Sequence, residues 1–369
     1  MAIRIGVVGV GFGTTVHIPA FQSEGLEVVA VCSRRQERAE EAAHRFGIPK
    51  TFTAWEDLVR FDGVDAISVA TPVSLHRPVV LGALAAGKHV ICEKPFGVDA
   101  AEAEQMWRAA TSSGCTAMIA HEFRFASARM RVSELLGEGY IGSLRLALLR
   151  LVRGGFAPPG ALTSAAAPSA PPEYVAARDA AASGAGFLFA LGSHYIDCLR
   201  HWFGEVATVS ADLVTFASER TGTSGVVLAD ADDTFLFTFE FVDGGYAQMV
   251  GTRAAPFGDG SSIEIYGSAG TLVTPQEGFN PPAHGTLLGA RLGEPALADL
   301  EIPERLAPFA DDRDDRLMPF RRFTREFIRG IEEGTSPGPS FHDGLRCQQL
   351  LDAARESSAT GHKVTLPKG

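Results

Sequence analysis

The sequence lacks the features that mark secreted, membrane-spanning or metal-stabilised proteins. No C-x-x-C pair occurs, and no apolar run reaches the roughly 20 residues that cross a bilayer. The apolar N-terminus is interrupted by glycines and has no signal-peptide cleavage site, so we expect a cytoplasmic protein. The cysteines are scattered, which predicts reduced thiols rather than a disulfide framework. They are Cys32, Cys92, Cys115, Cys198 and Cys347.

Positive charge is also scarce in this chain. It carries 33 Lys and Arg against 44 Asp and Glu, a formal net charge of −11. This balance argues against nucleic acid or an anionic membrane as a partner. No internal repeat is evident. What is present is a chain of 369 residues with 46% hydrophobic residues. That is too long for one ordinary core, so two globular domains are predicted.

Short apolar runs alternate with helix-length segments over the first 122 residues. Such alternation predicts an α/β domain, with a parallel sheet and helices on both faces. The predicted strands are 3–9, 26–33, 65–70, 88–92 and 115–123, and the predicted helices are a segment from near Gly13, 34–47, 76–87 and 99–114.

The pattern changes over residues 123–369. Predicted strands there follow one another directly, which indicates an α+β domain with a large, mostly antiparallel, open-faced sheet. Residues 154–186 are rich in Gly, Ala, Pro and Ser, and we expect a long loop or lid there. Residues 275–316 are predicted to be irregular, with the charged run DDRDDR at the surface. The predicted strands are 143–152, 206–214, 233–241, 245–252 and 263–267, and the predicted helices are 126–137, 192–204, 317–334 and 342–360.

The stretch GVGFGT follows a predicted strand and opens a predicted helix, which is the context of a dinucleotide-binding turn. Gly9 allows the tight turn, and Gly11 lets a pyrophosphate approach the backbone. The helix N-terminus supplies N–H donors to phosphate. Thr14 stands at the third glycine position and weakens the match, and the alternative is a turn that binds nothing. The predicted cofactor-binding residues are Gly9, Gly11, Phe12, Gly13 and Thr14.

The second predicted strand ends in AVCSRRQER, where an acidic residue would bind the ribose 2′-hydroxyl of NAD. This sequence has Ser33 and Arg34 there, with Arg38 one turn further on. Arginine suits the 2′-phosphate of NADP, and no carboxylate stands there to repel it. These three residues therefore favour NADP over NAD as the cofactor. The alternative is that the arginines are only the solvated first turn of a helix.

Two further strand ends carry candidate residues, because ligands of parallel sheets lie at the carboxyl ends of the strands. VATPVSLH places Thr71 and Pro72 past one strand, and His76 is either a cofactor-facing residue or a helix N-terminal one. ICEKPFG places Glu93 and Lys94 past the next strand, and both are predicted to contact the cofactor. A lysine there could exchange a proton with a substrate hydroxyl or donate a fixed hydrogen bond. The alternative is a surface lysine paired with Glu93.

Together these motifs resemble the glucose–fructose oxidoreductase/inositol dehydrogenase (Gfo/Idh/MocA) family. Further matches are HEFRF, GSHYID, EIYGSAGTL and FHDGLRCQQLLDAARESSATGHKV, in order and nearly end to end. The resemblance implies a Rossmann domain over 1–122 and a C-terminal domain over 123–369 whose open sheet faces the cofactor. The last helix, 342–360, could pack back on the Rossmann domain. The resemblance also implies homodimers or homotetramers formed through the open sheet.

The resemblance assigns site residues one by one. Lys94 matches the family's catalytic lysine, and His194 matches the histidine of the G-x-H-x-x-D helix, with Asp197 as its aspartate. Arg124 matches a strand-end residue that often lies near the substrate. Many members carry an aspartate four residues before the histidine, where this sequence has Ala190. The usual Lys–Asp–His set is therefore incomplete in this chain.

The residues around His194 also allow two other interpretations. A core histidine bonded to a backbone carbonyl is one. The other is a metal site, because Asp197 and His201 share a helical face with His194. Nothing else in the chain adds a ligand cluster, so no metal is predicted.

The combined prediction is an NAD(P)-dependent oxidoreductase, with Lys94 and His194 as catalytic residues and Arg124 and Asp197 as substrate-binding residues. It would transfer hydride between nicotinamide and a sugar, an inositol or a related cyclic polyol. Two alternatives remain open. One is a redox-assisted, NAD-dependent glycosidase. The other is a catalytically silent cofactor-binding regulator, which Ala190 favours and the retention of Lys94 and His194 opposes.

Overall fold

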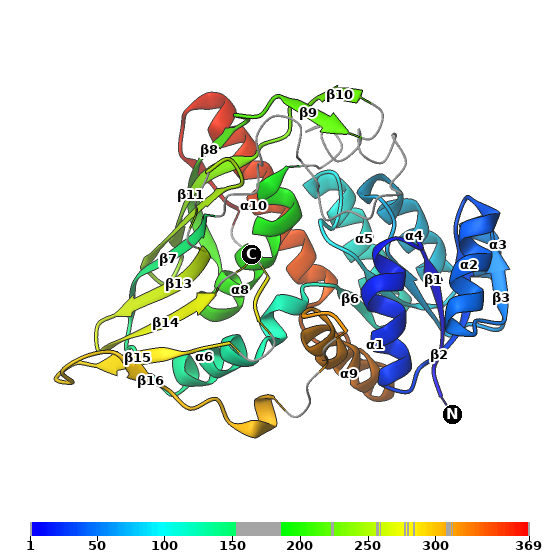
Figure 1. Cartoon of the computed structure of the whole chain (residues 1–369), viewed down its shortest axis with the longest axis horizontal. Helices are drawn as coiled ribbons and strands as arrows, with labels where there is room; N and C mark the ends of the chain where they lie inside the picture. The colour runs from blue at the N-terminus through cyan, green and yellow to red at the C-terminus, as the bar shows by residue number, and fades with distance from the viewer. Residues whose placement is uncertain are drawn as a thin grey trace. The chain divides into compact units, whose positions relative to one another are not determined.

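Two compact units make up the computed structural model of this chain (Figure 1). Unit 1 comprises Met1–Phe125 and Asp311–Gln348, and unit 2 comprises Ala126–Ala310 and Gln349–Gly369. The predicted boundary after residue 122 lies close to the first of these divisions. The predicted lid at 154–186 falls almost entirely outside the described residues. The structure describes residues 2–152, 186–222, 225–255, 258, 260–276, 278, 280–282, 285–307, 311 and 313–367.

Unit 1 contains a six-stranded sheet in the order β3-β2-β1-β4-β5-β6, and every neighbouring pair is parallel. This is the Rossmann arrangement that the alternating pattern predicted, and the prediction is confirmed. The predicted strand 115–123 is shorter than expected, because the chain leaves the sheet after Ile119 and turns into a 3-10 helix. The strands are β1 (Arg4–Val8), β2 (Glu27–Cys32), β3 (Lys50–Phe52), β4 (Ala66–Val69), β5 (His89–Cys92) and β6 (Ala117–Ile119).

Helices cover both faces of this sheet. Side chains alternate between faces along each strand, so that Val7 packs in the core formed with α1 and α9, whereas Val8 packs in the core formed with α3, α4 and α5. The helices are α1 (Ile18–Ser23), α2 (Gln36–Phe46), α3 (Trp55–Arg60), α4 (His76–Ala85), α5 (Ala100–Ser113), α9 (Leu317–Glu333) and α10 (Phe341–Thr360), with short helices η1 (Gly13–His17), η2 (Val73–Leu75) and η3 (Glu122–Phe125).

Late segments of the chain complete unit 1. Phe320, Phe323 and Phe327 of α9 are fully buried in its core. Phe341, at the start of α10, contacts Phe96 with ring centroids 4.5 Å apart. The first residues of α10 therefore belong to the Rossmann unit, whereas the residues of the helix after Gln348 belong to unit 2.

Unit 2 contains a nine-stranded sheet in the order β16-β15-β14-β13-β7-β12-β11-β8-β17. It is antiparallel except for the β7–β12 pair, so the predicted mostly antiparallel sheet is confirmed. The region predicted to be irregular, 275–316, contains two short edge strands. The strands are β7 (Leu144–Val152), β8 (Val206–Val214), β11 (Thr234–Phe241), β12 (Tyr246–Thr252), β13 (Gly260–Gly267), β14 (Gly270–Gln276), β15 (Leu288–Arg291), β16 (Ala298–Asp299) and β17 (Val364–Thr365), and a separate hairpin joins β9 (Glu219–Gly222) to β10 (Gly225–Leu228).

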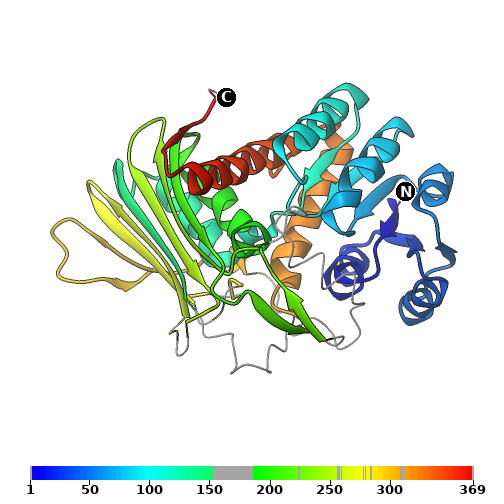
Figure 2. The same ribbon diagram turned by 90° about the horizontal axis from the view of Figure 1, so that it is seen from above.

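Among the described elements of unit 2, the long helices lie along one face of the large sheet, and the other face is bare (Figure 2). Strand β11 follows this division, because its phenylalanines at alternate positions are buried while Leu236 is exposed. The helices of the unit are α6 (Ser127–Gly137), the π-helical turn η5 (Leu188–Gly192), α8 (Ser193–Phe203), η6 (Glu304–Leu306) and the second part of α10. In the described residues, no helix is long and apolar enough to cross a membrane.

Candidate active site

The turn between β1 and η1 contains two glycines with different structural demands. Gly9 has a φ of 111°, and a Cβ there would lie 2.2 Å from the carbonyl oxygen of Ala70. The fold itself therefore requires glycine at this position. A Cβ on Gly11 would meet nothing within 4 Å. Gly11 thus leaves open space beside the backbone, which fits the close approach of a dinucleotide pyrophosphate.

The rest of the GVGFGT turn is held by local contacts. The Thr14 hydroxyl lies 3.0 Å from the carbonyl oxygen of Val10 and 2.9 Å from that of Gly11. Gly13 is buried, and a Cβ there would lie 3.0 Å from a methyl group of Val7. The guanidinium of Arg316 stacks on the ring of Phe12, 4.9 Å from its centroid. Arg316 belongs to the DDRDDR run, so this part of the run packs onto the turn rather than lying free at the surface.

The predicted NADP-selecting residues lie at the end of β2. The backbone N–H of Gly9 donates to Cys32 across the β1–β2 pair at 3.0 Å, which places this strand end beside the glycine turn. Ser33 and Arg38 are partly exposed, and Arg34 is exposed. The Ser33 hydroxyl accepts a hydrogen bond from the backbone N–H of Arg35 at 3.3 Å.

His76 connects the loops that follow β4 and β5. Its ring is 1% exposed, with Nε2 3.0 Å from the carbonyl oxygen of Thr71 and Nδ1 3.0 and 3.3 Å from those of Pro95 and Phe96. Burial lowers the pKa of His76, although these carbonyls act in the opposite direction. Pro72 is exposed beside this connection. The predicted contact of His76 with the cofactor stays a prediction.

Thr71 adds a second observation that fits a ligand at this edge of the sheet. Its side-chain Oγ1 is buried and has no hydrogen-bond partner among the described residues. Buried hydroxyls normally have such a partner. An unsatisfied hydroxyl past the end of β4, on a residue that packs beside Gly9 of the glycine turn, fits a group supplied by a bound cofactor.

Glu93 is the centre of a buried polar network that the sequence did not predict. His17 lies 2.9 Å from Oε1 of Glu93 through Nε2 and 2.7 Å from the hydroxyl of Ser68 through Nδ1. The backbone N–H of Lys94 donates to Oε2 at 3.2 Å. Burial would raise the pKa of Glu93, but the hydrogen bond to His17 and nearby positive groups outweigh it and hold the pKa below its usual value. Glu93 is therefore a buried carboxylate that is held in place by these hydrogen bonds, and Lys94 is the next residue in the chain.

Lys94 itself is partly exposed and directly follows this anchored residue. A second carboxyl, Glu122 at the start of η3, lies near it and is 1% exposed. Burial raises the pKa of Glu122 to about 8, and the charge of Glu93 adds to the rise, whereas Lys94 and Arg316 oppose it. Unit 1 thus places Lys94 and two carboxyls at the carboxyl edge of its sheet. The pKa of Glu93 is lowered, whereas the pKa of Glu122 is raised.

Arg124, the predicted substrate residue on η3, is 7% exposed. Its guanidinium lies 3.7 Å from the carboxylate of Asp343 on α10, within unit 1. The ion pair connects the strand-end motif HEFRF to the C-terminal helix.

His194 and Asp197 lie on α8 in unit 2 and are 3% and 0% exposed. The preceding turn is fixed by Asp232, whose carboxylate accepts the backbone N–H of Leu188 at 2.9 Å. Ala190, at the position of the usual aspartate, lies in this turn. These contacts set where α8 begins and therefore where His194 stands.

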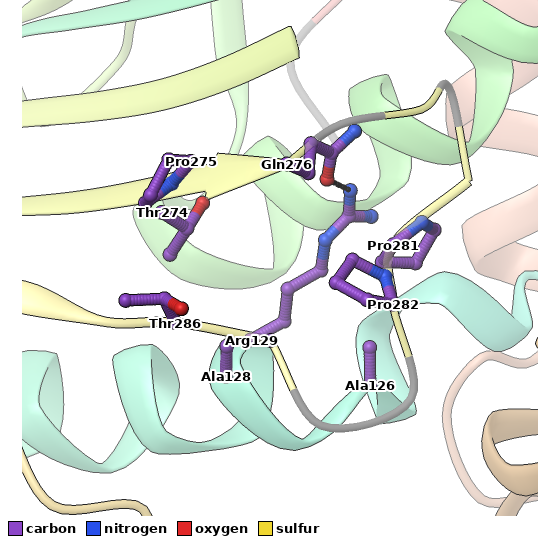
Figure 3. A pocket seen from close by; sticks show the side chains of 10 residues that line it. Ala126, Ala128, Arg129, Thr274, Pro275, Gln276, Pro281, Pro282 and Thr286 are labelled. Carbon is purple, nitrogen blue, oxygen red and sulfur yellow. Dashed lines mark hydrogen bonds between the residues drawn. The ribbon is translucent and has the colours of Figure 1, made fainter. Parts of the chain in front are cut away.

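Arg129 of α6 packs against the same helix, and Figure 3 shows its side chain pointing toward Gln276. Its guanidinium stacks on the ring of Tyr195 at 4.4 Å from the centroid and lies 3.5 Å from the sulfur of Cys198. It also donates to the side chain of Gln276 at 3.4 Å, and a small pocket opens beside it next to Pro281. Tyr195 and Cys198 each follow a predicted site residue, so Arg129 helps to hold the helix that carries His194.

The metal interpretation gains no support from the described residues, which contain no group of three or more His, Cys, Asp or Glu side chains that could hold an ion. His201, its third proposed ligand, is exposed and lies 3.4 Å from the hydroxyl of Ser133.

Comparison with protein families decides the relationship that these features suggest. Residues 3–121 match the family model described as oxidoreductase family, NAD-binding Rossmann fold, and residues 149–366 match its C-terminal alpha/beta domain. The chain belongs to the Gfo/Idh/MocA oxidoreductase family. The resemblance inferred from the motifs is therefore confirmed, and the chain has an NAD-binding Rossmann domain.

Curated relatives are similar over different shares of the chain. An uncharacterized oxidoreductase from Synechocystis sp. is 30% identical over 99% of this chain and 96% of its own. Levoglucosan dehydrogenase from Pseudarthrobacter phenanthrenivorans is 27% identical over 99% of this chain and 98% of its own length. Trans-1,2-dihydrobenzene-1,2-diol dehydrogenase from Mus musculus is 42% identical, but over 40% of this chain and 45% of its own.

Solved structures share the whole architecture. An oxidoreductase domain protein from Kribbella flavida superposes with a TM-score of 0.87 at 28% identity, and all of both chains is covered. Levoglucosan dehydrogenase in complex with NADH and levoglucosan superposes with a TM-score of 0.85 at 25% identity, again over all of both chains.

Proposed function

We propose that this oxidoreductase prefers NADP and transfers hydride between nicotinamide and a CH–OH carbon of a sugar, inositol or related cyclic polyol. The observation that carries the proposal is the position of Lys94, which follows the anchored Glu93 just past the end of β5. It stands on the same sheet edge as the turn that begins at Gly9. Support for the substrate class comes from levoglucosan dehydrogenase, which is similar over nearly the full length of both chains.

In this proposal the bound nicotinamide supplies or accepts the hydride, which is the difficult part of the chemistry. Lys94 exchanges a proton with the substrate hydroxyl, because the residue lies just past the carboxyl end of β5, where ligands of parallel sheets bind, and its backbone is held by Glu93. His194 is the second residue proposed for handling that hydroxyl proton. Arg124 and Asp197 are proposed to bind further hydroxyl groups of the substrate.

The cofactor-binding residues are proposed in three groups. The turn Gly9–Thr14 would hold the pyrophosphate. The edge beside the nicotinamide would be formed by Thr71, Pro72, His76, Glu93 and Lys94. Ser33, Arg34 and Arg38 would surround the adenosine ribose. Their exposure leaves room for a 2′-phosphate, and the two arginines would compensate its charge, so NADP is preferred.

The test is the absorbance of reduced nicotinamide with purified protein, NADP and NAD separately, and a panel of sugars, inositols and glycosides. Lys94→Met should lower the rate on the order of 10²- to 10⁴-fold, the usual contribution of a proton-transfer group, and should change cofactor affinity far less than the rate. Lys50→Met, at an exposed position of β3, is the matched control. A rate that survives in Lys94→Met would contradict the assignment.

Ala190 favours one alternative, the catalytically silent regulator. Tight cofactor binding without turnover on any substrate of the panel would support it. Cleavage of a glycoside with no net change in reduced cofactor would instead support the redox-assisted glycosidase.

We further propose that the bare face of the unit 2 sheet associates with a second copy of the chain to form a homodimer or homotetramer in the cytoplasm. Leu236 and Tyr246 lie on this face and are 43% and 46% exposed. Apolar surface of this kind is typical of an interface. Light scattering on the purified protein, with Leu236→Glu beside wild type, tests the association.

A further inference from the structure

Glu93 and Glu122 form a buried carboxyl pair at the ends of neighbouring strands. Glu93 directly follows β5, and Glu122 follows β6, which is parallel to β5 and paired with it up to Ile119. The carboxyl ends of adjacent parallel strands lie side by side, so both residues lie at one sheet edge, where the charge of Glu93 acts on Glu122. Two like charges in a buried site disfavour one another, and one carboxyl of such a pair tends to keep its proton.

The surroundings decide which carboxyl keeps the proton. Both oxygens of Glu93 are engaged, one with His17 and the other with the backbone N–H of Lys94. Among the described residues, Glu93, Lys94 and Arg316 exert electrostatic effects on the carboxyl of Glu122, and His17 and His76 act on Glu93. Arg316 is already held by two hydrogen bonds to Asp314 at 2.8 and 2.7 Å.

Glu122 is therefore the protonated member of the pair. Burial and the Glu93 anion together raise its pKa to about 8. A group that titrates near this value can give and take a proton at physiological pH, as proton-transfer residues do.

We propose that Glu122 stores a proton for Lys94 and exchanges it with the lysine amine during turnover. The proposal rests on the proposed function, because it gives Lys94 the exchange with the substrate hydroxyl. Glu122 acts through Lys94 and does not touch the substrate. It matters most when bound substrate separates Lys94 from solvent, since an internal donor is then needed.

The proton step balances without a further reactant. In the direction that reduces a carbonyl, the substrate oxygen takes a proton from the Lys94 ammonium, and one N–H bond breaks. The neutral amine then takes the proton of Glu122, which forms an N–H bond and leaves a carboxylate. The carboxylate recovers a proton from solvent after product leaves. In the oxidative direction the same transfers run in reverse.

The first experiment measures the protonation of the Glu122 carboxyl in the absence of turnover. Infrared difference spectra of the cofactor-free protein are recorded from about pH 7 to about pH 10, a range that brackets the expected midpoint. Wild type should lose a protonated-carboxyl band with a midpoint near the pKa of about 8, and Glu122→Gln should lack that band. Asp232, whose pKa burial raises to about 6, titrates mostly below this range. Wild type without such a band would overturn the proposal.

The same spectra test the link to Lys94. Lys94→Met removes a positive charge beside Glu122 and should move the midpoint upward, whereas Glu93→Gln removes the neighbouring anion and should move it downward. An unmoved midpoint in Lys94→Met would overturn the exchange. Because these measurements need no substrate, they show whether Glu122 holds the proton beside Lys94 even if the dehydrogenase function fails, so the two failures can be told apart.

The second experiment measures how kcat depends on pH, which tests proton transfer from Glu122 to Lys94 during turnover. With saturating substrate, kcat for carbonyl reduction in wild type should decline as the pH rises through about 8, where the store empties. Glu122→Gln should have a lower kcat without that decline, and Glu122→Asp, which can titrate, should restore it. Glu332→Gln, an exposed residue of α9, is the control and should follow wild type. A decline retained in Glu122→Gln would overturn the relay, because a merely structural carboxyl would leave the pH profile unchanged.

Discussion

The two ends of the candidate cofactor site are constructed in opposite ways. At the end of β2, Arg34 is exposed, and Ser33 makes one local hydrogen bond to the backbone. At the end of β5, Glu93 is buried and held by His17 and by the backbone of the residue that follows it. The exposed end can change its residues with little effect on folding and can therefore set cofactor selectivity. At the buried end, a substitution should affect both stability and activity, because each polar group there is a hydrogen-bond partner of another.

The largest effect is expected from His17→Phe at the buried end. A phenylalanine retains the ring contacts with Phe12, Phe21 and Phe320, at 5.5, 5.8 and 4.4 Å between centroids, so the variant isolates the loss of polar partners. Glu93 would remain buried without its histidine. Removing one partner of a buried pair costs about 3–5 kcal/mol in the free energy of unfolding.

Urea denaturation measures this cost, and His44→Phe, at an exposed position of α2, provides the matched control. The control should unfold as wild type does. A loss below about 1 kcal/mol in His17→Phe, as for surface pairs, would mean that the network does not hold this end of the site.

The next effect is a change in how stability depends on pH. Glu122 has a pKa raised from 4.5 to about 8 in the folded state, so the folded chain binds its proton more tightly than the unfolded chain. Its contribution to stability is complete below about 4.5 and is lost as the pH rises through about 8. Glu122→Gln should lack this loss of several kcal/mol.

Thermal or urea unfolding at a series of pH values checks this sign. Wild type should lose more stability than Glu122→Gln between weakly acidic and weakly alkaline pH, while Glu332→Gln should follow wild type. Parallel curves for wild type and Glu122→Gln would show that Glu122 titrates normally in the folded protein.

At the end of β5, what could be predicted from the sequence depends on how far apart the contacting residues lie along the chain. Thr71, Glu93 and Lys94 were predicted as site residues because each comes directly after a strand, and parallel strands place such positions at one edge. His17 and Ser68 were not predicted, because they meet Glu93 only after folding brings η1, β4 and β5 together. Ser68 in particular looks like one more small residue within an apolar strand.

Other misses have local causes. Glu122 was placed inside a predicted strand, because the apolar run before it gives no sign that pairing stops at Ile119. The DDRDDR run was predicted to be surface because of its charge, but Arg316 stacks on Phe12, and Asp311 is bonded to Arg321 at 3.2 Å. Charge alone does not indicate exposure when opposite charges are available to pair.

A smaller effect is expected from the two glycines that lie between the two ends. Gly9→Ala forces an unfavourable φ and a contact with the Ala70 carbonyl, which should cost about 1–3 kcal/mol or more in stability. Gly11→Ala has open space and should leave the free energy of unfolding within about 0.5 kcal/mol of wild type. It should weaken cofactor binding instead.

Calorimetric titration of NADP and NAD, with urea denaturation of the same samples, separates the two outcomes. Each glycine serves as the control for the other, since the same methyl group is added. Gly11→Ala with unchanged cofactor affinity would contradict the proposed approach of the pyrophosphate at this residue.

The smallest effect is expected at the exposed end, from Ser33→Asp. A carboxylate there would repel a 2′-phosphate and could accept hydrogen bonds from the ribose hydroxyls of NAD. We expect the preference to shift toward NAD by about tenfold, equivalent to about 1.4 kcal/mol, with no loss of stability. Ser112→Asp, an exposed position of α5, adds the same charge elsewhere in unit 1 and should leave the preference unchanged. If both variants shift it equally, net charge rather than the end of β2 sets the preference; if neither does, the arginines are only the solvated start of α2.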